Sequence, residues 1–312
     1  MKPWVAVAAA VPLATGCAVS EPPRTPAAEP PPPSSTQARD AGGALDRPRA
    51  ARPPAVPPGT TAGYVVFDRV SGKIVAHRNA RRKFRSASVV KILIALDLLN
   101  RTKTLSAEDA RLLKVMLRSS DDDAATNLWN RGGKGAIVTR MARELRLRET
   151  TPPPASKPGF WGYVSLSAYD VVTTYRHLLD RADPRARDLV LGHLRKATRC
   201  GTDGFDQSFG IPAAVPRPWA VKQGWSGFGL TPPVRCGGDV SAGGGAISQV
   251  AFAASGTGVP DYGRPVLHTT GLVGKDERYA VALLTAHPAG GSWNASVKRV
   301  TTLARDLYRA LP

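Results

Sequence analysis

The chain lacks several residue patterns, and each absence removes a class of protein. It has three cysteines among 312 residues and contains no Cys-x-x-Cys, His-Glu-x-x-His or Cys/His cluster. No metal site and no cofactor are therefore expected. No apolar run reaches the roughly eighteen residues that a permanent membrane-spanning helix requires. Acidic residues are also scarce: 24 Asp and Glu stand against 43 Lys and Arg, for a formal net charge of +19.

The excess positive charge is spread along the chain. Its densest run is Arg81, Arg82, Lys83 and Arg85. A basic surface can serve nucleic acid, anionic lipid or an acidic polymer. Because no recognition motif accompanies the run, nucleic acid is not expected as a partner.

The first residues resemble the signal peptide of a bacterial lipoprotein. Lys2 gives a positive start, and the apolar run Val5 to Leu13 has signal-peptide length. The run leads into Ala14-Thr15-Gly16-Cys17, which resembles a lipobox, although the family prefers Leu at the position of Ala14. Residues 1–17 are therefore predicted to be a signal peptide, with lipidation at Cys17. The alternative is ordinary secretion with cleavage nearby.

Residues 18–60 are predicted to be a linker. They are rich in Pro, Ala, Glu and Arg, and they have almost no large apolar residues with which to form a core. Pro-rich chains are extended and semi-rigid, which suits a spacer between a lipid anchor and a domain. We expect an exported monomer that is anchored outside the cytoplasm and has the membrane as a partner. A disordered tail without a role is the other interpretation of this segment.

Residues 61–312 carry periodicities that predict an α/β (α+β) domain. A hairpin is expected first, then helices, then strands, and last an amphipathic helix. The predicted ranges are 63–68 and 74–77 for the hairpin; 88–99, 106–118, 124–129, 136–145, 167–179 and 183–196 for helices; 219–224, 266–273 and 279–287 for strands; and 297–311 for the last helix. The hairpin and the last strands can complete one antiparallel sheet flanked by terminal helices. The helical block would form a second lobe, with a cleft where the lobes meet.

One Ser-x-x-Lys motif, Ser88-Val89-Val90-Lys91, falls at the start of a predicted apolar helix. Residues three apart on a helix share a face, so the serine and the lysine would lie one turn apart. A buried lysine can lose its proton and act as a base. A serine beside such an amine is a known design of nucleophile.

Two further motifs follow in order. Ser120-Asp121-Asp122 lies between two predicted helices, and Lys222-Gln223-Gly224 lies on a predicted strand. Together the three motifs resemble the Ser-x-x-Lys, Ser-Asp-Asn and Lys-Thr-Gly signature of the class A β-lactamases and penicillin-binding proteins. The resemblance covers residues 61–312 and implies their β-lactamase/transpeptidase-like fold.

The resemblance implies a role for each matched residue. Ser88 would attack a carbonyl carbon and form an acyl-enzyme, with Lys91 helping to remove its proton. Ser120 would pass a proton to the leaving nitrogen, and Lys222 would hold the substrate carboxylate. The backbone N–H groups of Ser88 and Trp225 would form the oxyanion hole. The expected ligand is a β-lactam or a peptidoglycan-type peptide.

Three substrate-binding positions also follow, and two of them depart from the family. Gly224 would let substrate lie against the strand. Asp122 replaces an amide, and an ionised carboxylate only accepts hydrogen bonds. Its charge would also favour the protonated form of Lys91, which weakens that lysine as a base. Gln223 replaces a shorter hydroxyl side chain.

A third departure concerns release of the acyl group. The family's Ω-loop carries a Glu that activates water, and the corresponding stretch here, 145–165, has no Glu-x-x-Leu-Asn pattern. Glu149 is its only carboxylate and is not expected to replace that Glu. A β-lactam should therefore stay attached to Ser88.

Two alternatives remain open at this stage. The altered motifs also fit a catalytically impaired pseudoenzyme that serves as a cell-envelope binding lipoprotein. An unrelated Ser-His-Asp hydrolase is disfavoured because Gly224-Trp225-Ser226-Gly227-Phe228 misses the Gly-x-Ser-x-Gly pattern at its last position.

Since export permits a disulfide, we expect one between Cys200 and Cys236 rather than two free thiols.

Overall fold

A five-stranded antiparallel sheet with the strand order β2-β1-β7-β6-β5 forms the centre of the fold. The computed structural model describes residues 53–157, 159–237 and 263–312. The strands are β1 (Thr61–Asp68), β2 (Lys73–Arg78), β5 (Trp219–Ser226), β6 (Val266–Val273) and β7 (Tyr279–Ala286). The predicted signal peptide, its Cys17 and most of the predicted linker lie outside the described residues.

The predicted hairpin and the late strands meet in this one sheet. β1 pairs with β2 on one side and, across more than two hundred residues of sequence, with β7 on the other. Successive side chains of a strand point to opposite faces. Val65 accordingly joins the core beneath the helical lobe, whereas Tyr64 and Val66 join a second core on the other face. Both faces of β1 are thus buried, which is why it has so few polar residues.

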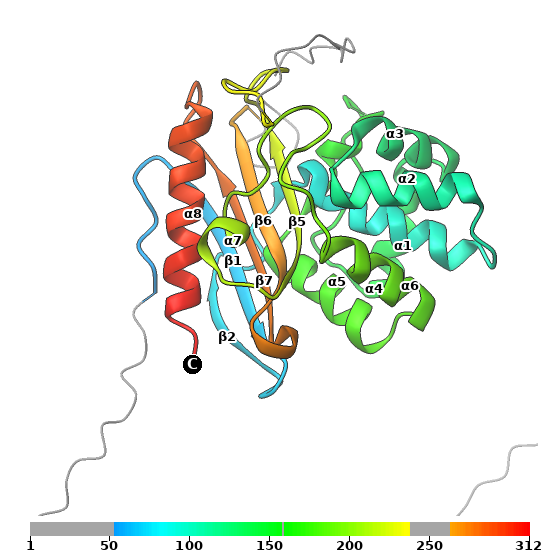
Figure 1. Cartoon of the computed structure of the whole chain (residues 1–312), viewed down its shortest axis with the longest axis horizontal. Helices are drawn as coiled ribbons and strands as arrows, with labels where there is room; N and C mark the ends of the chain where they lie inside the picture. Colours follow the sequence, from blue (N-terminus) through cyan, green and yellow to red (C-terminus); the bar gives the residue numbers. More distant parts are fainter. Residues whose placement is uncertain (1–52, 158, 238–262) are drawn as a thin grey trace, which may run out of the picture. The chain divides into compact units, whose positions relative to one another are not determined.

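The helix α8 (Trp293–Arg309) covers that second face, as Figure 1 shows. Ser292 caps its first turn by accepting a hydrogen bond from the backbone N–H of Ala295. Val300, Leu303 and Leu307 are buried in the core against the sheet. Of the terminal helices expected to flank the sheet, α8 is the one that the described residues contain.

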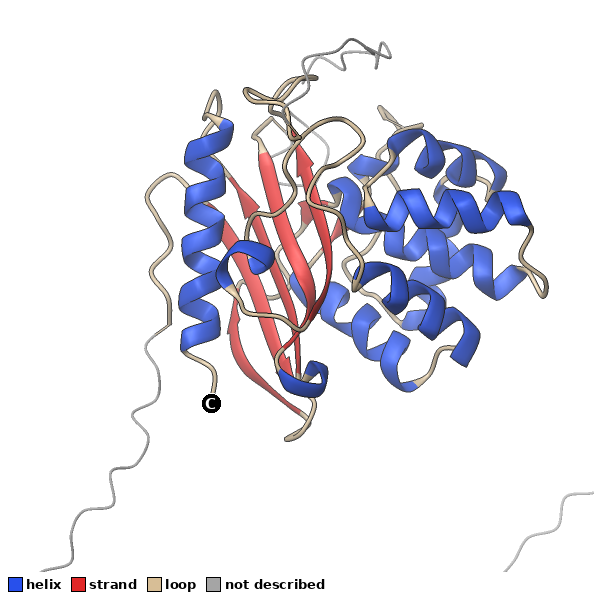
Figure 2. Cartoon of the chain, viewed as in Figure 1, coloured by secondary structure: helices blue, strands red, loops and turns tan. Residues whose placement is uncertain are grey.

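The other face is covered by the helical lobe (Figure 2). Its helices are α1 (Lys91–Arg101), α2 (Ala107–Arg118), α3 (Asp122–Arg131), α4 (Gly135–Leu145), α5 (Ala168–Asp180) and α6 (Pro184–Leu194). All six were predicted, with differences of a few residues at their ends. Ser106 and Ser167 cap α2 and α5 as their sequence patterns indicated. No helix within the described ranges combines the length and apolarity needed to cross a bilayer.

The structure corrects the predicted start of the first helix. Ala87–Val90 forms a separate 3-10 turn, η1, and Lys91 is the first residue of α1. Ala87 has φ +43°, a left-handed conformation that is strained for a residue with a side chain. This local break separates the turn that carries Ser88 from the regular helix.

Several short elements were not predicted. They are β3 (Phe84–Arg85), which pairs with β4 (Ser165–Leu166), the 3-10 turns η2 (Trp161–Tyr163) and η3 (Lys275–Glu277), and α7 (Ile211–Ala214). Segments of two to four residues are too short to show a hydrophobic period, so tertiary contacts define them. The β3–β4 pair matters for the site because it joins the start of η1 to the end of η2.

An internal carboxylate joins α1 to α4. Asp97 is buried and accepts hydrogen bonds from Arg140 Nε at 2.7 Å and Nη2 at 2.9 Å. Arg101, one turn further along α1, bonds the same carboxylate at 2.9 Å. We expect Asp97→Ala to lower the free energy of unfolding by about 3 kcal/mol, because it leaves the partly buried Arg140 without its counter-ion. Urea unfolding followed by circular dichroism measures this change.

The matched control is Asp188→Ala. Asp188 pairs with Arg187 at 2.9 Å but is 70% exposed, so its loss should cost less than about 1 kcal/mol. Equal losses in the two variants would contradict the role given to the α1–α4 contact.

Candidate active site

Ser88 and Lys91 lie at the junction of η1 and α1, and both side chains are almost wholly buried. The 3-10 turn places Ser88 against the edge strand β5. A Cβ added to Gly224 would lie 3.2 Å from the backbone nitrogen of Ser88 and 3.1 Å from the carbonyl oxygen of Ser86. Gly224 therefore permits a close approach that a larger residue would obstruct.

The ammonium group of Lys91 has a full set of acceptors. It donates to the Ser120 carbonyl oxygen at 2.6 Å, to Ser120 Oγ at 3.3 Å and to Asp122 Oδ1 at 2.5 Å. An ammonium has three N–H donors, so these contacts use its capacity. The ring of Trp161, centred 4.6 Å from Nζ, covers another side of the group. These partners hold the Lys91 side chain between the α2–α3 turn and the Trp161 ring.

Ser120 lies in the tight turn between α2 and α3, with φ +56°. Its hydroxyl accepts a second hydrogen bond from Lys222 Nζ, at 2.8 Å. A hydroxyl oxygen has two lone pairs, and two lysine donors fill both. The O–H of Ser120 is then directed elsewhere and can donate to a ligand.

Lys222 is buried on β5 and donates to the Gln223 carbonyl oxygen at 3.1 Å. Burial lowers the pKa of Lys222 well below the ordinary lysine value, and the charge of Lys91 lowers it further. The carboxylates of Asp122 and Asp203 act in the opposite direction. A positive charge on Lys91 thus disfavours a positive charge on Lys222. The Asp122 carboxylate contacts Lys91 directly, at 2.5 Å.

Gln223 does not join this group. Its amide Nε2 donates to the Phe209 carbonyl oxygen, and its side chain is buried. Neighbouring residues on a strand face opposite ways, so the residue after Lys222 points away from Ser120. In this arrangement the Gln223 amide nitrogen is engaged by Phe209, and a role in binding substrate stays a prediction.

The segment that corresponds to the Ω-loop brings an indole, rather than a carboxylate, to Lys91. Trp161 in η2 is held by a hydrogen bond from its Nε1 to Thr126 Oγ1 at 3.1 Å and by Ser86 Oγ, which donates to its carbonyl oxygen at 3.3 Å. Glu149 instead pairs with Arg81 at 3.0 Å. The three sequence motifs gave no signal for this contact between Trp161 and Lys91.

The chain is similar to known proteins in both sequence and structure. No family model matches the chain. In sequence it is similar to the protein named "Putative lipoprotein LppW" of Mycobacterium tuberculosis and of Mycobacterium bovis, with 39% identity over 212 residues. The match spans 65% of this chain and 64% of the relative, so it covers less than two thirds of LppW.

Among solved structures, the chain is similar to a mutant of PBP-A in an acyl-enzyme complex with penicillin G. That match has a TM-score of 0.56 and 18% identity and covers 81% of this chain and 90% of the other. A class A β-lactamase from Mycobacterium abscessus matches with a TM-score of 0.54 and 19% identity, over 81% and 94% of the two chains. The chain has the fold of the class A β-lactamases. The resemblance expected from the three motifs is confirmed at the level of the fold.

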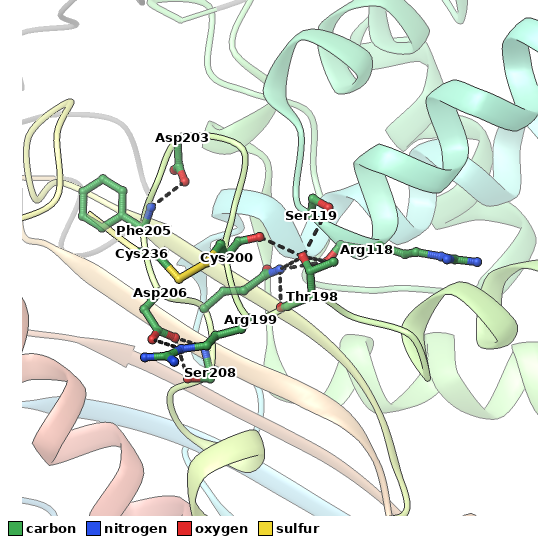
Figure 3. The surroundings of a disulfide bond; sticks show 11 residues. Arg118, Ser119, Thr198, Arg199, Cys200, Asp203, Phe205, Asp206, Ser208 and Cys236 are labelled. Atoms are coloured by element: carbon green, nitrogen blue, oxygen red, sulfur yellow. Dashed lines mark hydrogen bonds and ion pairs between the residues drawn. A yellow bond between two sulfur atoms is a disulfide. The ribbon is translucent and has the colours of Figure 1, made fainter. Parts of the chain in front are cut away.

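The structure contains a disulfide between Cys200 and Cys236, as the sequence led us to expect. Figure 3 shows that it lies beside Thr198 and Asp203. Thr198 Oγ1 donates to Ser119 Oγ at 3.2 Å, next to the Ser120 turn. Asp203 accepts a hydrogen bond from the indole Nε1 of Trp225 at 2.9 Å. The cross-link thus fixes a loop that contacts the site on two sides.

Asp203 is a residue of this site that the motifs did not reveal. Burial raises the pKa of Asp203, and the nearby charge of Asp122 raises it further. The backbone N–H of Phe205 and the indole of Trp225 oppose this shift by bonding the ionised form. A single Asp in a loop carries no sequence signal, and only the fold shows that it holds Trp225.

We expect Cys236→Ser to lower the free energy of unfolding by up to about 4 kcal/mol, as cross-link entropy predicts for a loop with a sequence separation of 36. Chemical denaturation with and without dithiothreitol measures this loss. The reductant should destabilise the wild-type chain and leave the variant unchanged. An unfolding free energy that is insensitive to both changes would contradict the structural role of the disulfide.

Proposed function

We propose that the chain is an exported serine acyl-transfer enzyme that forms an acyl-enzyme at Ser88 with β-lactams or peptidoglycan-type peptides. The observation that carries this proposal is the hydroxyl of Ser120, which accepts hydrogen bonds from two buried lysines, Lys91 and Lys222. Ser88 lies one turn before Lys91 and against the same strand as Lys222. These positions support a site in which the Ser88 hydroxyl faces the Lys91 amine and the Ser120 hydroxyl.

In the proposed reaction Lys91 acts in its neutral form: Ser88 Oγ attacks the amide carbon as its proton moves to Lys91 Nζ. The backbone N–H groups of Ser88 and Trp225 stabilise the oxygen anion that develops. As the C–N bond breaks, the hydroxyl proton of Ser120 moves to the leaving nitrogen, and Lys91 returns the proton taken from Ser88 to Ser120 Oγ. Lys222 donates a hydrogen bond to the substrate carboxylate, whose negative charge would favour the ammonium form of this lysine. Acylation thus needs no group beyond the residues already described.

Release of the acyl group is proposed to be slow. In the described part of the chain, the carboxylate that contacts Lys91 is that of Asp122, and the Ω-loop segment contributes the Trp161 ring instead. A hydrolytic water would need a general base on that side of Ser88. The similarity in fold to the PBP-A mutant, whose structure is described as an acyl-enzyme complex with penicillin G, supports the formation of an adduct but carries no information on its release.

A second candidate function is binding without turnover. Asp122 lies 2.5 Å from the Lys91 ammonium, so Lys91 must give up a favourable ion pair before it can accept a proton. That contact supports a pseudoenzyme that retains the ligand cleft as a cell-envelope binding protein. The presence of a covalent adduct distinguishes the two.

We further propose that the protein is tethered to the cell membrane by lipid on Cys17. The lipobox-like sequence and the similarity to LppW, which is named as a lipoprotein, support this location. Secretion without a lipid remains the alternative. The predicted linker would separate the domain from the bilayer.

The purified full-length chain is expected to form a covalent adduct with a fluorescent penicillin that survives denaturing electrophoresis. Ser88→Ala should abolish the adduct because it removes the nucleophile. Ser71→Ala, on the exposed turn of the β1–β2 hairpin, is the control and should label as the wild type does. An adduct that persists in Ser88→Ala would refute the assignment of the nucleophile, and no adduct with the wild type would favour the binding function.

Asp122→Asn is expected to accelerate acylation roughly tenfold, which corresponds to about 1.4 kcal/mol in the barrier. The change removes the carboxylate that forms an ion pair with Lys91 and restores an amide able to donate to substrate. Stopped-flow or gel-based labelling at several penicillin concentrations measures the rate. Asp123→Asn removes the same charge from the next, exposed position of α3 and should leave the rate unchanged. Equal rates in the two variants would show that Asp122 does not limit acylation.

A further inference from the structure

A second pocket, of about 350 Å³, lies in the helical lobe between the end of α4 and the outer side of α5. Arginines dominate its lining: Arg81, Arg146, Arg148, Arg176 and Arg181. Two carboxylates, Glu144 and Asp180, accompany them, so the lining carries an excess of three positive charges. None of these residues belongs to the group around Ser88 and Lys91.

Two of the arginines are held in place by aromatic rings. The Arg81 guanidinium lies 4.1 Å from the centre of the Tyr169 ring and is also bonded to Glu149. The Arg176 guanidinium lies 4.1 Å from the centre of the Phe67 ring. A guanidinium that stacks through its face still has N–H donors along its edge. Such preorganised donors lose little entropy when they bind a ligand.

The other three arginines have no acidic partner within the described ranges. Arg146 and Arg181 follow the last residues of α4 and α5, where a cation also stabilises the helix dipole. Arg148 is outside any helix and has no such role. Glu144 keeps its charge, but a hydrogen bond from Asn100 Nδ2 at 2.8 Å orients its carboxylate toward α1. The pocket therefore holds more positive charge than helix capping explains.

We propose that this pocket binds a phosphate-bearing anion. Guanidinium groups donate paired hydrogen bonds to phosphate oxygens, and several of them together match its multiple charge. The volume is in the range of small-molecule sites, so it admits a phosphoester with part of its organic group. The phosphate could belong to a lipid headgroup or to a soluble molecule. The proposal does not depend on acylation of Ser88.

The test uses the full chain carrying Cys17→Ser, so that no lipid anchor contributes to binding. Inorganic pyrophosphate is titrated by calorimetry, with citrate as an anion that lacks phosphorus. Flotation with phosphatidylglycerol vesicles tests the lipid source. The pocket variant is Arg146→Gln, Arg148→Gln and Arg181→Gln. The control variant, Arg111→Gln, Lys298→Gln and Arg309→Gln, removes the same charge elsewhere on the surface.

Binding to pyrophosphate or to the vesicles should be at least roughly tenfold weaker in the pocket variant and nearly unchanged in the control, because charge-assisted hydrogen bonds are lost only in the former. If the chain binds the vesicles but does not bind pyrophosphate, the phosphate belongs to a lipid headgroup. Thermal unfolding checks that both variants are folded. The proposal is overturned if neither probe binds, if both variants weaken equally, or if citrate binds as tightly as pyrophosphate.

Discussion

Two buried lysines share one serine hydroxyl, and the construction of the site depends on how their charges are compensated. An isolated ammonium in a protein interior is strongly unfavourable unless acceptors surround it. Lys91 has the Ser120 carbonyl, the Ser120 hydroxyl and Asp122, which fixes the α2–α3 turn against the start of α1. Lys222 reaches the same hydroxyl from β5 and has a lowered pKa. The contact therefore joins the helical lobe to the sheet.

The contact of Trp161 with Lys91 concerns what happens to an acyl group once it is attached to Ser88. Function depends on the residues grafted onto a fold rather than on the fold itself. Here the segment after α4 covers the lysine with an indole, and its carboxylate, Glu149, is engaged by Arg81. If Ser88 is acylated as we propose, the same arrangement that leaves acylation possible withholds a base for hydrolysis. The chain would then trap its ligand rather than degrade it.

The loop that is cross-linked by the Cys200–Cys236 disulfide contacts the site through residues outside the three motifs. Cys200 and Cys236 hold the loop whose Thr198 bonds to Ser119 and whose Asp203 holds the indole of Trp225. Ser119 directly precedes Ser120, and Trp225 is itself proposed to form part of the oxyanion hole. Both contacts therefore reach residues of the proposed site. Cross-linking limits the movement of this loop in the folded chain. An exported protein can use such a bond, because the compartment preserves it.

The sequence alone determined the order of the elements and the identity of the three motifs. Hydrophobic periods and caps are local, so the long helices and strands were predictable to within a few residues. The three motifs in their order indicated the family's fold. The sequence did not predict the contacts between distant segments. These are the contact of Trp161 with Lys91, that of Asp203 with Trp225, and the group of arginines near Tyr169. The direction of the Gln223 side chain likewise depended on the placement of β5. Such juxtapositions leave no periodic trace in a sequence, because only packing in three dimensions brings them together.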